Sequence, residues 1–256
     1  MDKITGPIFC LTSDTDWASD FAIEDLISTA RSFNIKPMLF ATNQSQVLEK
    51  HLNSDTIEVG LHPNYLLGST HGQDIISVTD HIMRLFPRAT AYRSHCFYYQ
   101  YAVEAEMTKR DIRYDSNMCL YLQPGIVPLR RVLGVVAFPV FWEDDTHWYN
   151  QATWNVDSYL PYFLTPGLKI LNVHPFFFTS NIPNQEYYGK IKGFIQTASA
   201  QNIQDLRYKG QGVRTFVLDL LKVLTDQGHR FYSFSELCSK FPLEKILHPP
   251  INNVSK

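Results

Sequence analysis

The chain has 256 residues, of which 45% are hydrophobic, and a formal net charge of -2 at pH 7. No long basic run provides a footprint for a phosphate backbone, so nucleic acid is not an expected partner. No uninterrupted apolar stretch of about 18 residues predicts a transmembrane segment, and the N-terminus lacks the pattern of a signal peptide, which together predict a cytoplasmic protein. The length favours one domain over residues 1–256.

The first predicted element is a buried strand over residues 8–11, followed closely by Asp14 and Asp16. In barrels and open α/β sheets the chemistry lies at the carboxyl ends of such strands. A helix cap and a solvated carboxylate would explain the same pattern. What favours a functional site is that the chain repeats this arrangement.

Four further strand-like segments end in residue types that serve in metal ligation and acid–base catalysis. Residues 56–62 end in His62, residues 91–95 contain Arg93 and His95, residues 134–145 end in Trp142, Glu143, Asp144 and Asp145, and residues 168–174 end in His174. Together the five strand ends predict one polar site at one end of a parallel sheet or barrel.

The segments between these strands have helical spacing. Helices are predicted over residues 22–30, 44–52, 75–85, 101–112, 186–197 and 213–224, and further strands over 36–41, 113–122 and 230–234. Residues 147–167 show no clear period and are interpreted as an insertion over the site. The alternation of strands and helices predicts an α/β fold, with a mostly parallel sheet and helices outside it.

In this order, the strand ends resemble the motifs of the polysaccharide deacetylases of the NodB-homology superfamily, and most closely those of lipopolysaccharide O-antigen biosynthesis. Residues 12–16, Thr-Ser-Asp-Thr-Asp, resemble the Thr-Phe-Asp-Asp-Gly motif, His62 opens the histidine motif, and His174 lies before Pro175 as the late histidine does. The resemblance implies an irregular (β/α) barrel of about seven strands that binds a divalent metal, usually zinc, through one Asp and two His.

The resemblance also implies roles for individual residues. Asp14 would be the base, Arg93 would keep it charged, and His174 would be the acid, although Asp14 and Asp16 could exchange roles. Asp16 and His62 would bind the metal; Leu66 occupies the position of the second histidine, so His71 is predicted as the third ligand, with His95 in reserve. Trp142, Asp144 and His95 are expected to contact the substrate.

These roles imply a metal-dependent hydrolase that removes an acetyl or other acyl group from an N-acylated sugar or glycan precursor in surface polysaccharide biosynthesis. Two alternatives remain open. One is an amide hydrolase of the same fold that acts on a non-sugar substrate. The other is a carbohydrate-binding family member without a metal, which the missing His-x-x-x-His spacing favours.

Overall fold

The computed structural model describes residues 4–242, and its strands form one nine-stranded sheet in the order β6-β7-β5-β4-β3-β2-β1-β9-β8. The strands are β1 (Pro7–Asp14), β2 (Met38–Ala41), β3 (Glu58–Leu61), β4 (Ala91–Tyr92), β5 (Tyr114–Asp115), β6 (Leu129–Arg130), β7 (Val136–Ala137), β8 (Val140–Glu143) and β9 (Gly167–Asn172). Neighbouring strands are parallel except for the antiparallel pair β6 and β7.

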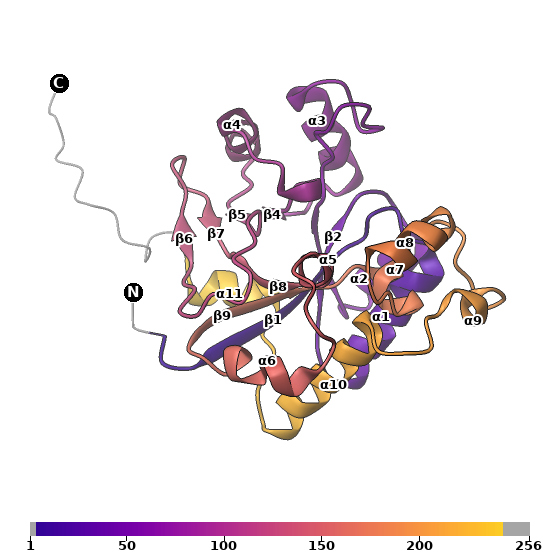
Figure 1. Cartoon of the computed structure of the whole chain (residues 1–256). Helices are drawn as coiled ribbons and strands as arrows, with labels where there is room; N and C mark the ends of the chain where they lie inside the picture. Colours follow the sequence, from indigo (N-terminus) through magenta and orange to yellow (C-terminus); the bar gives the residue numbers. More distant parts are fainter. Residues whose placement is uncertain (1–3, 243–256) are drawn as a thin grey trace, which may run out of the picture.

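Helices cover the sheet in groups (Figure 1). The α-helices are α1 (Asp20–Ser32), α2 (Gln46–Asn53), α3 (Ile75–Leu85), α4 (Tyr101–Lys109), α5 (Asp144–Tyr149), α6 (Val156–Phe163), α7 (Pro175–Ser180), α8 (Gln185–Ile191), α9 (Ile203–Leu206), α10 (Val213–Asp226) and α11 (Phe234–Lys240). Short 3₁₀ helices, η1 (His95–Phe97) and η2 (Lys192–Phe194), follow β4 and α8. In the view of Figure 1, α3 and α4 lie at the top, α6 and α10 at the bottom, and α1, α7 and α8 to the right.

The sheet curls, because residues that follow β5 hydrogen-bond to β8 at the opposite edge. Leu120 N–H donates to the Val140 carbonyl at 2.8 Å, and Val140 N–H donates to the Met118 carbonyl at 2.8 Å. These bonds complete an irregular half-barrel. The predicted (β/α) fold is therefore confirmed, although four of its strands, β4 to β7, have only two residues each.

Strand β1 lies inside the sheet, paired with β2 on one side and β9 on the other. All of its residues from Ile8 to Asp14 are buried, as expected for a strand of a parallel sheet covered on both faces. Because side chains alternate along a strand, Thr12 and Asp14 share one face. This alternation directs an aspartate and a threonine to the inside of the curl at its carboxyl end.

Several predicted elements differ from the structure. The strand predicted over residues 113–122 is reduced to β5, and the strand-like segment 134–145 divides into β7 and β8, after which α5 begins. The strand predicted over residues 230–234 is reduced to one bridge between Phe231 and Phe9, because the N-cap Ser233 begins α11 immediately afterwards. The predicted insertion over the site contains α6, which instead packs Phe163 against Phe141 of β8 and Phe216 of α10. Helix α6 therefore covers the core.

A cavity of about 1070 Å³ lies at the amino ends of β2 and β3, and Met38, Glu58 and Phe234 are among its lining residues. It is therefore at the opposite end of these strands from the polar residues that follow them. Within residues 4–242, no helix combines the length and apolar character needed to cross a bilayer.

Candidate active site

The turn after β1 orients Asp16 by means of two successive left-handed residues. Asp16 has φ 43° and Trp17 has φ 58°, a conformation that non-glycine residues adopt rarely and at an energetic cost. The Trp17 N–H donates to Oγ1 of Thr42 at 3.1 Å, and this hydrogen bond ties the turn to the end of β2. As a result, the side chains of Asp14 and Asp16 point in different directions.

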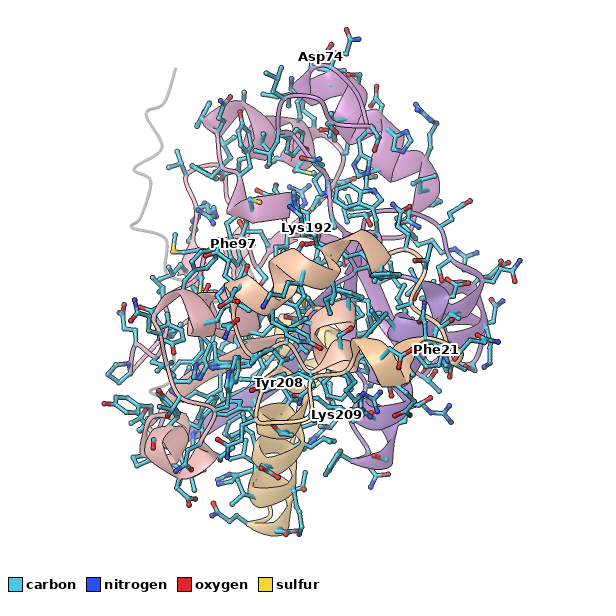
Figure 2. All side chains as sticks on the ribbon, turned by 45° about the vertical axis from the view of Figure 1, so that its right-hand side comes forward. Phe21, Asp74, Phe97, Lys192, Tyr208 and Lys209 are labelled. Atoms are coloured by element: carbon cyan, nitrogen blue, oxygen red, sulfur yellow. The ribbon has the colours of Figure 1, made fainter. Side chains whose placement is uncertain are left out.

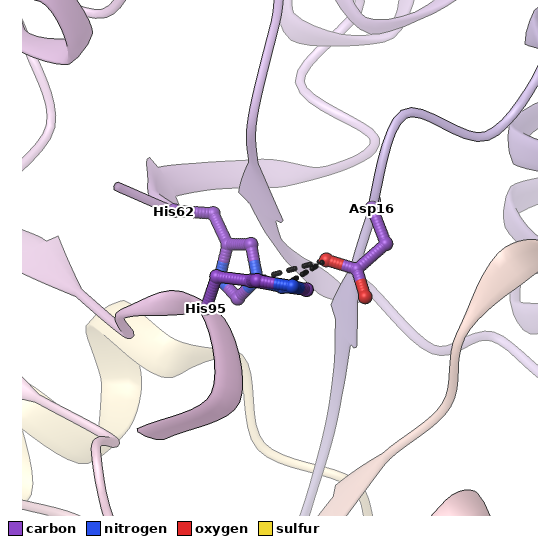
Figure 3. Close-up of side chains that lie close together, drawn as sticks. All are labelled: Asp16, His62 and His95. Atoms are coloured by element: carbon purple, nitrogen blue, oxygen red, sulfur yellow. Dashed lines mark hydrogen bonds and ion pairs between the residues drawn. The ribbon is translucent and has the colours of Figure 1, made fainter. Parts of the chain in front are cut away.

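Asp16, His62 and His95 form a group that could hold a metal ion (Figure 3). Nε2 of His62 and Nδ1 of His95 each lie 3.0 Å from the same oxygen of Asp16. Burial alone would raise the pKa of Asp16, but hydrogen bonds from the two imidazoles hold it well below its usual range. One carboxylate and two imidazoles are the donor types that a catalytic zinc site uses.

Asp14 is held by a buried hydrogen-bond network on the other side of the turn. Arg93 is fully buried, and its Nη1 donates to Oδ1 of Asp14 at 2.9 Å and to Oδ1 of Asn172 at 2.6 Å. The Asn172 amide donates to Oδ2 of Asp14 at 2.9 Å. Both oxygens of Asp14 are therefore oriented by donors that are themselves fixed.

Glu143 is a third carboxyl group in this network. It accepts hydrogen bonds from Nδ2 of Asn172 at 2.8 Å and from Oγ1 of Thr146 at 2.7 Å. Burial, and then the negative charge of Asp145, raise the pKa of Glu143 well above its ordinary value. Asp14, Glu143 and His174 form a second group of close, buried ligand types. Each of these three already has protein partners.

His174 follows β9 and is fixed by Asp144. Its Nδ1 lies 2.6 Å from Oδ1 of Asp144, and its backbone N–H donates to Oδ2 at 2.8 Å. Burial alone would lower the pKa of His174, but the charge and the hydrogen bond of Asp144 raise it well above its ordinary value. Its other nitrogen, Nε2, lies 3.6 Å from Oδ2 of Asp16. Nε2 of His174 therefore faces the Asp16 group.

The structure brings together Asp14, Asp16, His62, Arg93, His95, Asp144 and His174, all of which the sequence singled out. His71 lies outside the Asp16 group. Its Nδ1 accepts a hydrogen bond from the Asn64 N–H at 3.2 Å, and its ring stacks on His81 at 5.0 Å. Burial lowers the pKa of His71 to about 4.

Trp142, predicted as a substrate contact, does not reach the site. Its side chain is fully buried, stacks on Phe216 at 5.1 Å and donates from Nε1 to Nδ1 of His147 at 3.0 Å. Sequence reasoning also missed Asn172, which joins Asp14, Glu143 and Arg93. The available signal was its position two residues before His174, on a strand that lies beside β1.

Comparison with known proteins agrees with this arrangement of strand ends. The model of the WbmS-like polysaccharide deacetylases matches residues 11–192. The chain belongs to this family. The matched region contains every residue of the site described above, and it ends within the segment that follows α8. Polysaccharide deacetylases hydrolyse an amide bond, so the chain is a deacetylase-like enzyme by family.

A member of this family has a solved structure. It comes from Bordetella bronchiseptica, is described as a candidate polysaccharide deacetylase involved in O-antigen biosynthesis, and matches with 28% identity, a TM-score of 0.75 and coverage of 84% of this chain and 90% of that one. A 4-alpha-glucanotransferase from Thermococcus litoralis shares the fold at 12% identity and a TM-score of 0.51, covering 94% of this chain and 41% of that one. No curated protein matches the chain.

Proposed function

We propose that this family member is a metal-dependent hydrolase that removes an acyl group, normally acetyl, from an N-acylated sugar or glycan precursor during surface polysaccharide (O-antigen) biosynthesis. The observation that carries the proposal is that Asp14, Asp16 and His174 lie close together but have different hydrogen-bond partners. Two imidazoles converge on Asp16, while Asp14 is held by Arg93 and Asn172, with Nδ1 of His62 at 3.8 Å. His174 presents Nε2 from a third direction.

The residues present fit a zinc-class ion. The proposed ligands are Asp16, His62 and His95, whose ligand atoms lie within 4.8 Å of one another. His95 replaces His71 in the proposal because His71 is committed to Asn64 and His81. When bound, zinc polarises a carbonyl and lowers the pKa of water from about 15.7 toward about 7.

Asp14 is the proposed general base. Its Oδ1 and Oδ2 accept hydrogen bonds from Arg93 and Asn172, so the carboxylate cannot rotate freely. A base must lie within hydrogen-bond reach of the proton that it removes, and a fixed carboxylate meets this need without paying for reorientation. Arg93 is a positioning residue in this scheme, because its contacts are with Asp14 and the surrounding strands.

His174 is the proposed general acid. Asp144 raises its pKa well above the ordinary value, which favours the protonated imidazole that an acid requires. Asp144 occupies Nδ1, which leaves Nε2 as the nitrogen that faces the Asp16 group. A proton on Nε2 would pass to the departing amine as the C–N bond breaks.

The test is release of acetate by zinc-loaded protein from N-acetylated mono- and oligosaccharides, with Asp14→Asn as the matched inactive variant. We expect activity that depends on zinc and falls at least about 10²-fold in the variant, which removes the base but changes little volume. Hydrolysis only of non-sugar amides would favour the amidase alternative. Sugar binding without zinc uptake or hydrolysis would favour the binding-protein alternative.

A further inference from the structure

The direction of proton transfer fixes where the sugar of the substrate must lie. In amide hydrolysis the general acid protonates the nitrogen of the leaving group, and in an N-acylated sugar this nitrogen is attached to the sugar ring. If His174 is the acid, the ring lies on the His174 side of the site and the acyl group lies toward Asp16. This step rests on the proposed function.

An aromatic cluster adjoins His174 on that side. We define it as Trp148, Tyr149, Phe177 and Tyr188. The ring of Phe177 lies 4.8 Å from the ring of His174, and Trp148 and Tyr188 lie 4.8 Å and 4.9 Å from Phe177. Trp148 and Tyr188 are 5.6 Å apart, and Tyr149 extends the cluster from Trp148 at 6.1 Å.

The cluster runs from the interior to the surface. Phe177 and Trp148 are each only 8% exposed, whereas Tyr188 is half-buried and Tyr149 is 63% exposed. Three separate helices supply it: α5, α7 and α8. Figure 2 shows the segment of α8 and η2, marked by Lys192, crossing the middle of the molecule. Aromatic rings therefore lead from the proposed acid outward to solvent.

Two polar groups of the cluster have no protein partner within residues 4–242. Nε1 of Trp148 is buried without a hydrogen bond. The hydroxyl of Tyr188 makes none either, and its surroundings include the charges of Asp16 and His174. A tyrosine hydroxyl is a hydrogen-bond donor at neutral pH. An unpaired buried donor such as Nε1 of Trp148 is costly, and a bound ligand can supply the acceptor that it lacks. The Tyr188 hydroxyl is not fully buried and is free to donate to a ligand.

We propose that the aromatic cluster is the subsite for the sugar ring that carries the acylamino group, and that the Tyr188 hydroxyl donates a hydrogen bond to a hydroxyl oxygen of this ring. The aromatic side chains supply apolar surface for the C–H face of the ring. The donors select a polyhydroxylated substrate over an aliphatic amide. Tyr188 is thus a specificity-determining residue supplied from outside the strand ends.

The test compares Tyr188→Phe, which removes only the hydroxyl, with Tyr162→Phe on the exposed face of α6. Tyr162 is 48% exposed and belongs to a helix that packs on α10, so it is a control for loss of a tyrosine hydroxyl. The probes are N-acetylglucosamine, its β-1,4-linked dimer and N-acetylgalactosamine, with N-acetylglycinamide as the non-sugar amide. Binding to zinc-loaded protein is measured by saturation-transfer NMR and calorimetry, and hydrolysis by acetate release.

We expect Tyr188→Phe to weaken sugar binding or raise KM by about 2- to 10-fold, the range for one lost hydrogen bond, with little change for the non-sugar amide. Tyr162→Phe should match the parent. Equal sugar affinity in Tyr188→Phe and the parent, or failure of every sugar to bind, would overturn the subsite. If the parent releases acetate and Tyr188→Phe has the same KM, the subsite is refuted and the proposed hydrolysis stands. If the parent binds sugars but releases no acetate, and Tyr188→Phe binds them more weakly, the proposed hydrolysis is refuted and the subsite stands.

Discussion

Asp144 binds His174 twice, through a 2.6 Å contact to Nδ1 and a 2.8 Å hydrogen bond from the backbone N–H. One carboxylate therefore sets both the ring orientation and the backbone position of the proposed acid. The backbone N–H of His174 donates to Oδ2 and the ring contacts Oδ1. Replacing either carboxylate oxygen by the NH2 group of an asparagine must therefore disturb one of these two hydrogen bonds. This relationship leads to the first prediction.

Asp144→Asn should lower kcat by at least about 10²-fold, because the amide cannot accept both hydrogen bonds of His174. His174→Ala should lower kcat by at least as much. Asp145→Asn is the matched control, since Asp145 neighbours the pair without a hydrogen bond to His174. Steady-state kinetics with acetate detection provides the measurement. If Asp144→Asn retained parental kcat, the orienting role of Asp144 would be refuted.

The second prediction concerns the metal ligands. His95→Ala and His62→Ala should lose bound zinc, because each removes an imidazole that points at Asp16. His71→Ala should retain one zinc with affinity reduced by no more than about 10-fold, since His71 packs on Trp17, which in turn packs on His95. Elemental analysis after gel filtration, together with competition by a chelator, gives stoichiometry and affinity. Zinc lost from His71→Ala but kept by His95→Ala would restore His71 as a ligand.

The third prediction concerns stability. Arg93→Met should reduce the free energy of unfolding by about 3–5 kcal/mol, because it leaves the buried carboxylate of Asp14 without its cationic partner. Arg110→Met is the control: Arg110 pairs with two carboxylates, Asp80 and Glu106, whereas Arg93 pairs with one, but the Arg110 side chain is 21% exposed. We expect a loss of about 1 kcal/mol or less there. Urea unfolding of the parent and the two variants measures both losses of free energy. Equal losses in Arg93→Met and Arg110→Met would contradict the larger contribution predicted for the buried pair.

The fourth prediction concerns acid stability. His147 lies among aromatic rings, and its Nδ1 accepts hydrogen bonds from Trp142 and Tyr121. Burial lowers the pKa of His147 to about 4, below the ordinary value of 6.5. Folding therefore favours the neutral ring, and the stabilisation is complete above pH 6.5 and declines as the pH falls from 6.5 to 4.

His147→Gln should remove this dependence. The free energy of unfolding of the parent should fall by about 3 kcal/mol more than that of the variant over this pH interval. His71, whose pKa is also lowered to about 4, contributes to both proteins. The difference between the two curves therefore isolates His147. Parallel curves would show that folding does not shift the pKa of His147.

The sequence predicted the elements that a pattern within one short segment reveals, such as helical spacing or an apolar run with a polar end. The apolar run before Asp14, the helical spacing of residues 213–224 and the polar ends at His62 and His174 all have a period or a boundary that one segment reveals. The predicted fold followed from these segments. Strand β1 also proved to be the buried, two-sided strand that its apolar sequence indicated.

What the sequence could not supply depends on side-chain direction between distant segments. His71 and His95 both follow His62 in the chain, and only the path of residues 63–74, fixed by the Asn64 N–H, turns His71 toward His81. Trp142 lies next to the end of β8, where the strand has an irregular register, and its side chain stacks on Phe216 in the core. Asn172 has no motif of its own, and its role arises from the pairing of β9 with β1.

That pairing joins two segments of the chain that are synthesised at different times. Asp14 and the Asn172 amide that holds it are separated by 158 residues. At about 5–20 residues per second, a ribosome takes roughly 10–30 s to make the second after the first. Until then one edge of β1 lacks its partner, and the nascent chain carries an exposed apolar strand. Assembly of the base therefore waits until residue 172 has been made, and a protein truncated before residue 172 would lack a competent site.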